Sequence, residues 1–289
     1  KITRGHEAIH GDEIQEIRRI IDENRLHTAA STGAFEEVAV QAAYIERVSR
    51  DLSLSRPLKV VLDAGNGAGG PVAAKALRAI GAEVDELFCE PDGTYPNHHP
   101  DPTIPANLEA LITRVKEIGA DAGIALDGDG DRIGAVDDTG RIIWGDELLI
   151  LYAGPILARR PGEAIVFDVK CSNRLAEAVE AMGGRPVMSP TGHSLVRARL
   201  VAEKAPLGGE LSGHIFFEDG YLGYDDAIFS AARLLHLISS GDETLAERMA
   251  AIPASISTPE LRIESTDEEK FEIVESLRAH FREKYETNE

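Results

Sequence analysis

The sequence predicts an α/β protein made of two similar units in tandem, and three observations carry that prediction. The chain has 289 residues, more than one average domain and fewer than three. Hydrophobic residues make up 43% of it, enough for well-packed cores. A strand, a loop, a helix and a second strand occur in that order in residues 58–88, and the order recurs roughly a hundred residues later. Two tandem units fit this repeat better than one large sheet.

Two helices are predicted before the first unit. Apolar residues recur at helical spacing in residues 11–24 and again in residues 36–51. The first unit then follows as a strand, a glycine turn, a helix and a strand, in residues 58–63, 64–70, 71–81 and 82–88. Pro71 stands near the first helical position, where its missing N–H costs little.

The second unit repeats this order. Its strand, loop, helix and strand are expected in residues 164–169, 170–174, 175–183 and 185–190. In each copy an aspartate closes or nearly closes the first strand, Asp63 in one and Asp168 in the other. We expect the boundary between the units near residues 140–146. After Ala254 the pattern predicts a strand, an acidic turn and a charged helix with no evident core of its own.

Composition excludes some classes of partner. The net charge of −20 argues against nucleic acid, whose phosphates would be repelled. No segment approaches the roughly 18 uninterrupted apolar residues of a membrane span. Cys89 and Cys171 are far apart and form no metal or redox spacing, which favours a reduced, cytoplasmic setting. Anionic small molecules stay possible, because the local field at a site can oppose the global charge.

The run DGDGDR, residues 127–132, is the strongest chemical signal. Asp127, Asp129 and Asp131 alternate with glycines directly after the apolar run AGIAL. Carboxylate oxygens are the ligands that hard divalent cations prefer, and glycines let the backbone turn tightly enough for the three to converge. The run therefore predicts a metal site rather than a solvated acidic turn.

A calcium-binding EF-hand is the rival interpretation of this loop. It requires glycine at loop position 6, where the chain has Arg132, and glutamate at position 12, where it has Asp138. It also requires flanking helices, and both flanks here predict strands. Arg132 beside the metal aspartates instead indicates an anion shared by the cation and a guanidinium, as in phosphoryl transfer.

The glycine turn raises the alternative of an NAD-dependent oxidoreductase. Gly65, Gly67 and Gly70 match the G-x-G-x-x-G pattern between a strand and a helix, and Asp85 follows where a ribose-binding acid would stand. The second unit offers no matching site for hydride chemistry, and this interpretation leaves DGDGDR unexplained. A glycine turn that permits tight strand-to-helix packing is therefore favoured.

Three loops of the second unit concentrate polar side chains. Lys170 follows one predicted strand, and His193 follows the next. The run GGELSGH presents the other three, Glu210, Ser212 and His214. If the preceding segments are parallel strands, all three loops lie at one edge of the sheet, where open α/β sheets bind ligands. Glutamate and serine can share hydrogen bonds with sugar hydroxyls, while lysine and histidine suit a phosphate or a proton.

Taken together, DGDGDR, GELSGH, TGHS, DVKC and PNHHPDP make the chain similar to the α-D-phosphohexomutase family, in particular its bacterial phosphomannomutase/phosphoglucomutase members. The resemblance covers nearly the whole chain in order. It implies tandem mixed-sheet α/β domains of the phosphohexomutase type, with four domains in a complete enzyme. By it, residues 1–38 are the tail of domain 1, 39–142 domain 2, 143–255 domain 3, and 256–289 a linker and the start of domain 4.

The resemblance also implies roles. Asp127, Asp129 and Asp131 resemble the ligands of one Mg²⁺, and Arg132 the adjacent active-site arginine. Glu210, Ser212 and His214 resemble the sugar-recognition loop, and Lys170 and His193 the partners for phosphate and proton transfer; Arg132, Lys170, His193 and His214 are thus the expected catalytic residues. Leu211 stands where dual-specificity mannose/glucose enzymes carry methionine. For residues 97–102 (part of PNHHPDP), a rigid proline-bounded turn is favoured over a histidine metal site, with no catalytic role.

The implied reaction converts a hexose 1-phosphate into a hexose 6-phosphate through a phosphoserine and a hexose 1,6-bisphosphate. The implied partners are phosphorylated hexoses, bound by a monomer or homodimer. The family's Ser-His-Asn-Pro run and its C-terminal Arg-x-Ser-x-Thr loop do not occur in the sequence. Ser31, Ser172 and Ser194 have no matching context, so we expect no catalytic phosphoserine in this chain and no turnover by it alone. A non-catalytic sugar-phosphate binding protein stays an alternative.

Overall fold

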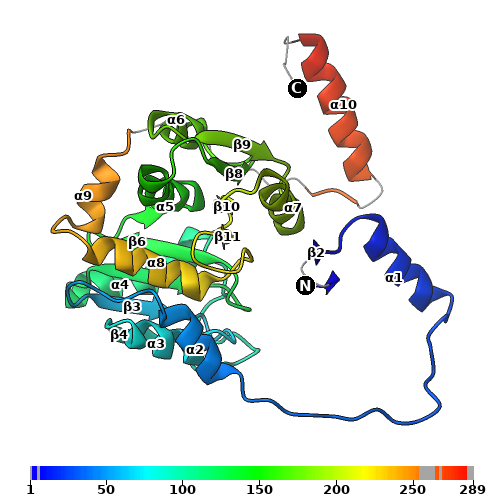
Figure 1. Cartoon of the computed structure of the whole chain (residues 1–289), viewed down its shortest axis with the longest axis horizontal. Helices are drawn as coiled ribbons and strands as arrows, with labels where there is room; N and C mark the ends of the chain where they lie inside the picture. Colours follow the sequence, from blue (N-terminus) through cyan, green and yellow to red (C-terminus); the bar gives the residue numbers. More distant parts are fainter. Residues whose placement is uncertain (1, 5–6, 254–263, 267–268, 285–289) are drawn as a thin grey trace. The chain divides into compact units, whose positions relative to one another are not determined.

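The computed structural model describes residues 2–4, 7–253, 264–266 and 269–284 (Figure 1). By internal packing the chain separates into two compact parts, Lys1–Pro253, which contains both α/β units, and Ala254–Glu289. The charged helix predicted after Ala254 is α10 (Glu269–Lys284). The strand predicted just after Ala254 falls almost entirely on residues 254–263, outside the described part of the chain.

Short elements precede the first sheet. Strands β1 (Thr3–Arg4) and β2 (Glu7–Ala8) pair antiparallel, and α1 (Asp12–Asp22) confirms the first predicted helix. Helix α2 (Gln41–Ser49) begins five residues later than the predicted start at residue 36. Val38 and Val40 are exposed, so a helix there would bury no face, and most helical stability comes from such burial.

The first unit forms a mixed five-stranded sheet in the order β4-β3-β5-β6-β7. Its strands are β3 (Lys59–Asp63), β4 (Glu83–Leu87), β5 (Ala122–Leu126), β6 (Ile133–Asp137) and β7 (Ile142–Ile143). Strands β3, β4 and β5 are parallel, while β6 and β7 run antiparallel to their neighbours. Its helices are α3 (Gly70–Ala79), the 3₁₀ helix η1 (Pro105–Leu108) and α4 (Glu109–Ile118). The predicted strand–turn–helix–strand is confirmed.

The second unit forms a mixed four-stranded sheet in the order β11-β10-β8-β9. Its strands are β8 (Ala164–Asp168), β9 (Arg185–Ser189), β10 (Leu207–Gly209) and β11 (Ile215–Phe217). The first three are parallel and β11 is antiparallel. Five helices accompany them: α5 (Gly145–Arg159), α6 (Asn173–Ala181), α7 (His193–Glu203), α8 (Ala227–Ser239) and α9 (Leu245–Ala250).

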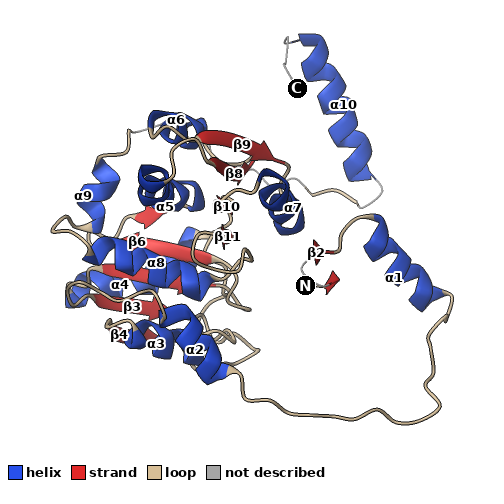
Figure 2. Cartoon of the chain, viewed as in Figure 1, coloured by secondary structure: helices blue, strands red, loops and turns tan. Residues whose placement is uncertain are grey.

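Alternating residues of each central strand point to opposite cores, as the two-residue period of a strand requires. In β3, Val60 and Leu62 face the core shared with α3, whereas Val61 faces the core under α4. In β8, Ile165 faces that same shared core and Val166 faces the separate core under α7. Helices therefore cover both faces of both sheets (Figure 2).

Helix α8 joins the two sheets. It follows the second sheet in sequence, yet it contacts α2, α3, β5 and β6 of the first unit. At its first turn, the Asp226 carboxylate accepts hydrogen bonds from the hydroxyls of Tyr44 on α2 (2.9 Å) and Tyr221 (2.7 Å). The core is continuous through this helix, which fixes the loops of one sheet against those of the other. No helix in the described ranges is long and apolar enough to cross a bilayer.

Candidate active site

The DGDGDR loop connects β5 to β6 and folds around the side chain of Asp127. This carboxylate is buried, and its Oδ1 accepts three backbone N–H groups at 3.0 Å, from Gly130, Asp131 and Arg132. Its Oδ2 accepts the Arg132 Nε–H at 2.7 Å. Burial raises the pKa of the Asp127 carboxyl, and the guanidinium and the loop N–H groups oppose that shift. Both flanks of the loop are strands, as the exclusion of an EF-hand required.

The three aspartates converge as the sequence predicted. One carboxylate oxygen from each of Asp127, Asp129 and Asp131 lies within 4.8 Å of the others; Asp127 is buried, Asp131 half-buried and Asp129 exposed. Two oxygens bound to one Mg²⁺ are at most about 4.2 Å apart. The spacing of the three oxygens exceeds that limit by at most about 0.6 Å, and this all-oxygen donor set suits Mg²⁺.

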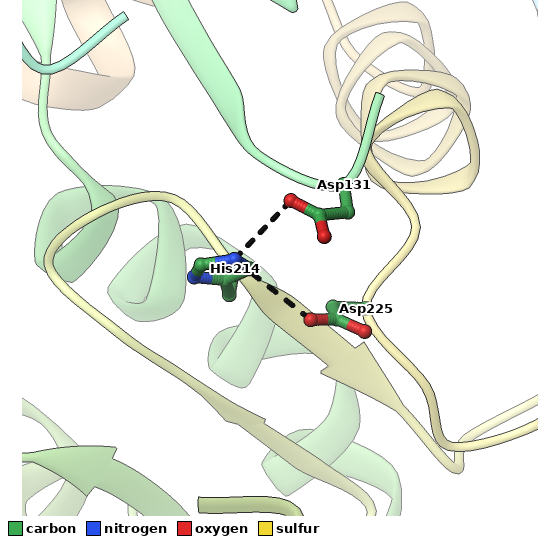
Figure 3. Close-up of side chains that lie close together, drawn as sticks. All are labelled: Asp131, His214 and Asp225. Atoms are coloured by element: carbon green, nitrogen blue, oxygen red, sulfur yellow. Dashed lines mark ion pairs between the residues drawn. The ribbon is translucent and has the colours of Figure 1, made fainter. Parts of the chain in front are cut away.

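His214 connects this loop to the GELSGH loop. Its Nε2 lies 3.2 Å from Asp131 Oδ1 and 3.9 Å from Asp225 Oδ2, and its Nδ1 lies 2.9 Å from Glu210 Oε2. Figure 3 shows the imidazole pointing between Asp131 and Asp225. Burial works against the charged imidazole, but the hydrogen bonds to Asp131 and Glu210 outweigh it and raise the pKa of His214 to about 9.

The backbones of the two loops also meet. His214 and Arg132 form an isolated antiparallel bridge, and the Ile133 N–H donates to the Gly213 carbonyl at 3.1 Å. Gly213 has a φ of +97°, and a Cβ there would stand 2.3 Å from the Ile133 carbonyl oxygen. Only glycine fits this approach. The GELSGH loop is thus part of the same site as the metal loop.

The predicted polar loops of the second unit follow β8, β9 and β10, three parallel strands, so they lie at one edge of the sheet as expected. Glu210 Oε1 accepts the Gly192 N–H at 2.7 Å, and Ser212 Oγ lies 3.0 Å from His214 Nδ1. The His193 and His214 rings are 5.9 Å apart. Lys170 is exposed on the loop after β8. Burial acts to raise the pKa of Glu210, yet His214 and the Gly192 N–H lower it overall.

Asp168 holds two of these loops, a role that the sequence did not reveal. It is fully buried; its Oδ1 accepts the Leu211 N–H at 3.0 Å and its Oδ2 accepts the Thr191 hydroxyl at 2.8 Å. The signal was present, since an aspartate closes the first strand of both repeats. Cys171 also donates to Asp168, and burial raises the pKa of its thiol, which argues against a thiolate role.

Asp63 is the counterpart in the first unit. It accepts the Gly65 N–H at 2.9 Å, and its Oδ2 lies 3.0 Å from His98 Nε2. Burial raises the pKa of Asp63, and His98 opposes that shift. Sequence reasoning also missed Asp225, which contacts His214, and Asp101, whose Oδ1 lies 3.2 Å from Arg132 Nη1. Their partners are distant in sequence, so no local pattern marks them.

The glycine turn packs against the metal loop. The N–H groups of residues 65 to 68 all donate within the protein, to Asp63 Oδ1 and to the carbonyls of Phe88, Ala64 and Gly128. Asp85, the expected ribose ligand of the dehydrogenase alternative, forms a bidentate pair with Arg114 at 2.8 and 2.9 Å. This geometry favours the packing role over a pyrophosphate site.

Comparison with known proteins gives two consecutive family matches. The model described as phosphoglucomutase/phosphomannomutase, alpha/beta/alpha domain II, matches residues 42–140, and that of domain III matches residues 144–256. Phosphomannomutase/phosphoglucomutase from Pseudomonas putida is 47% identical over 277 residues, which are 96% of this chain and 59% of that protein. The chain thus spans less than two thirds of the length of this curated relative.

Solved structures agree. A phosphoglucomutase/phosphomannomutase family protein from Burkholderia thailandensis matches with a TM-score of 0.87 and 44% identity, over 94% of this chain and 58% of that one. The fold is also shared with Aspergillus fumigatus N-acetylphosphoglucosamine mutase in complex with GlcNAc-6P and magnesium, at a TM-score of 0.56 and 18% identity, over 74% of this chain and 52% of that one.

Proposed function

Because the chain belongs to the phosphoglucomutase/phosphomannomutase family, we propose that the full-length protein interconverts hexose 1-phosphates and hexose 6-phosphates. One observation carries this proposal beyond the family assignment. His214 contacts Glu210 of the sugar-recognition run and Asp131 of the aspartate run, so the two most specific motifs form one site. A mutase needs both functions within reach of one bound sugar.

In this proposal Asp127, Asp129 and Asp131 hold one Mg²⁺. The bound ion supplies positive charge that stabilises the transferring phosphoryl group. Asp127 does more than supply a ligand oxygen, because its carboxylate organises the loop through three backbone N–H groups. Arg132, a quarter exposed beside it, presents its guanidinium to the same phosphoryl oxygens.

The sugar loop binds the hexose away from the reacting ends. Glu210 and Ser212 can accept and donate hydrogen bonds to adjacent hydroxyls of the ring. A site that recognises the middle of the sugar accepts it in both orientations, as transfer at either O1 or O6 requires. Lys170 and His193 stand on neighbouring loops at the same sheet edge and are suited to bind the phosphate and move a proton.

The proposed route passes through a phosphoserine and a hexose 1,6-bisphosphate, which also serves as activator. The substrates proposed are mannose and glucose phosphates, because Leu211 is apolar like the methionine of the dual-specificity enzymes. We also propose a cytoplasmic location, since both cysteines are buried free thiols.

A ³¹P NMR time course on the full-length protein tests the proposal. Mannose 1-phosphate or glucose 1-phosphate is supplied with Mg²⁺ and a trace of the hexose 1,6-bisphosphate. We expect a growing 6-phosphate signal that EDTA stops. A matched pair of variants assigns the site: Glu210→Gln is expected to abolish conversion, while Glu218→Gln, outside the site, leaves it unchanged.

Two other outcomes would contradict the proposal. Binding of the bisphosphate without exchange of phosphate would identify a non-catalytic sugar-phosphate binding protein. A change in nicotinamide fluorescence on titration would instead support an oxidoreductase that uses the glycine turn.

A further inference from the structure

The segment 97–102 packs behind the metal loop and the glycine turn. Asn97 Nδ2 donates to Asn66 Oδ1 at 2.8 Å, and a Cβ on Gly65 would stand 2.8 Å from the Cβ of Pro100. Pro100 also packs against the metal loop, since a Cβ on Gly128 would lie 3.4 Å from the Cγ of Pro100. The segment therefore has contacts with both loops that surround the candidate active site.

The first of the two adjacent histidines of this segment is held by the protein at both ring nitrogens. His98 Nε2 lies 3.0 Å from Asp63 Oδ2, and its Nδ1 lies 3.0 Å from the His99 carbonyl. Both ring nitrogens face acceptors of the protein, so His98 acts as a bridge within the fold. Among the described residues, the clusters that could hold an ion include neither His98 nor His99.

Asp101 connects this segment to Arg132 of the candidate active site. Its backbone N–H donates to the His99 carbonyl at 2.8 Å within the segment, and its Oδ1 accepts the Thr103 N–H at 3.0 Å and the Thr103 hydroxyl at 2.7 Å. The same oxygen accepts Arg132 Nη1 at 3.2 Å. Both side chains of this ion pair are largely buried, with exposed fractions of 15% for Asp101 and 25% for Arg132. An ion pair in this setting is screened less than a surface pair.

Arg132 is thus held at two points. Asp127 Oδ2 accepts its Nε–H at 2.7 Å and Asp101 accepts its Nη1–H, from a loop 31 residues earlier in sequence. Because a guanidinium is planar, two contacts on different nitrogens set the direction of the whole fork. Asp127 alone would leave the group free to tilt about the Nε–H contact.

We propose that Asp101 is a positioning residue for Arg132, and that residues 97–102 form the brace that fixes Asp101. The inference rests on the proposed mutase function. Asp101 touches no reacting group; it sets the angle at which Arg132 meets the transferring phosphoryl group. Loss of such a supporting contact in other sites typically costs about tenfold to a hundredfold in activity.

A double-mutant cycle in the full-length protein tests the proposal. Lysine at position 132 presents a compact ammonium that cannot contact both aspartates as the fork does. We expect Asp101→Ala to lower kcat about tenfold when Arg132 is present and less than about twofold in the Arg132→Lys background. An equal factor in both backgrounds would mean that Asp101 acts only through its turn, and would overturn the proposal.

Two further variants separate positioning from folding. Thr103→Val removes one hydrogen bond to Asp101 and leaves the carboxylate on Arg132, so it should lower Tm while kcat stays unchanged. Asp101→Asn keeps an acceptor for the Thr103 turn but removes the charge, so it should lower kcat with little effect on Tm. If Thr103→Val lowers kcat as much as Asp101→Asn, the turn and not the ion pair is responsible.

A spectroscopic measurement is independent of turnover. With selective ¹⁵N-arginine labelling, Arg132→Lys identifies by its loss the signal of the Arg132 Nη1–H, the group that Asp101 accepts. We expect that signal to be sharp and protected from exchange in the wild type and in Thr103→Val, and broadened in Asp101→Ala. A sharp signal in Asp101→Ala overturns the positioning role. Absence of mutase activity in the wild type would refute the proposed function alone, because this measurement still reports the contact.

Discussion

His214 Nε2 lies 3.2 Å from Asp131 Oδ1, and this contact joins the loop after β10 to the loop after β5. The two loops come from different sheets, and α8 packs against α2, α3, β5 and β6 within a core that residues of both sheets share. The imidazole also contacts Glu210 on its other side and faces Asp225. Because the three carboxylates come together around the imidazole only in the folded protein, the charge of His214 depends on folding.

The charge of His214 predicts a pH-dependent stability in the metal-free protein. Its pKa rises from 6.5 to about 9 on folding. A group whose pKa is raised in the folded state stabilises the fold fully below the unfolded pKa of 6.5, and that stabilisation is lost as the pH rises through 9. We expect a loss of up to about 3 kcal/mol in the free energy of unfolding. Urea denaturation in EDTA, at pH values from 6 to 10, measures it.

His214→Gln is the control for this prediction, because other groups titrate in the same range. The difference between wild type and His214→Gln isolates the histidine. Glu210→Gln should move the midpoint to lower pH, since it removes a carboxylate from Nδ1. A wild-type imidazole that titrates near pH 6.5 by NMR would contradict the assignment.

Substitutions of Asp127 and Asp129 are expected to distinguish an effect on stability from an effect on metal binding. Asp127→Asn places an amide among the loop N–H groups and Arg132, so a donor must face a donor; we expect a loss of about 1–3 kcal/mol in stability and no turnover. Asp129 is exposed, so Asp129→Asn should change stability by less than about 0.5 kcal/mol. Both should weaken Mg²⁺ binding at least about tenfold, measured by calorimetry. Equal thermal shifts in the two variants would refute the buried-organiser role of Asp127.

Much of the fold was predictable because its signals are local. The runs 58–63 and 164–169 are mostly apolar, have an aspartate at or next to their last position, and precede a turn and a helical pattern. Each forms a parallel strand of a separate sheet. The helix predicted over residues 36–51 was placed too early at its start. Helical periodicity in residues 36–40 does not reveal whether other residues cover Val38 and Val40, and both are exposed.

Those parts of the candidate site that depend only on sheet topology were predictable from the sequence. Since the carboxyl ends of parallel strands meet at one edge, the positions of Lys170, His193 and Glu210 followed from the strand order. The contacts of His214 with Asp131 and of Asp101 with Arg132 did not. These contacts depend on how α8 and the segment 97–102 pack. The periodicity of apolar residues predicts helices and strands, but it does not predict how two sheets are oriented relative to each other.

Asp168 is expected to control the placement of the sugar loop. Asp168→Asn replaces one of the two acceptors that hold Leu211 and Thr191 with a donor, inside a fully buried site. We expect a loss of about 1–3 kcal/mol in stability and a rise in KM, because the GELSGH loop loses its anchor. Thr191→Val is the matched control: it removes one hydrogen bond and should cost about 1 kcal/mol, with a smaller effect on KM. An unchanged KM in Asp168→Asn would limit this residue to folding.

Gly67 tests whether the glycine turn serves the metal loop or a dinucleotide. A Cβ at this position would stand 2.8 Å from the Gly128 carbonyl oxygen and 3.0 Å from that of Asp127, both backbone atoms of the metal loop. Gly67→Ala must therefore displace that loop, and we expect weaker Mg²⁺ binding and lower kcat.

Gly93→Ala is the control for this substitution, because a Cβ there meets nothing within 4 Å. It should leave both quantities unchanged. Calorimetric titration with Mg²⁺ and the ³¹P NMR assay measure them, and nicotinamide fluorescence follows any dinucleotide. If Gly67→Ala keeps its Mg²⁺ affinity but loses nicotinamide binding that the wild type shows, the turn binds a cofactor and its packing role is wrong. If neither ligand responds, the metal loop yields to the extra methyl group, and its position does not depend on the turn.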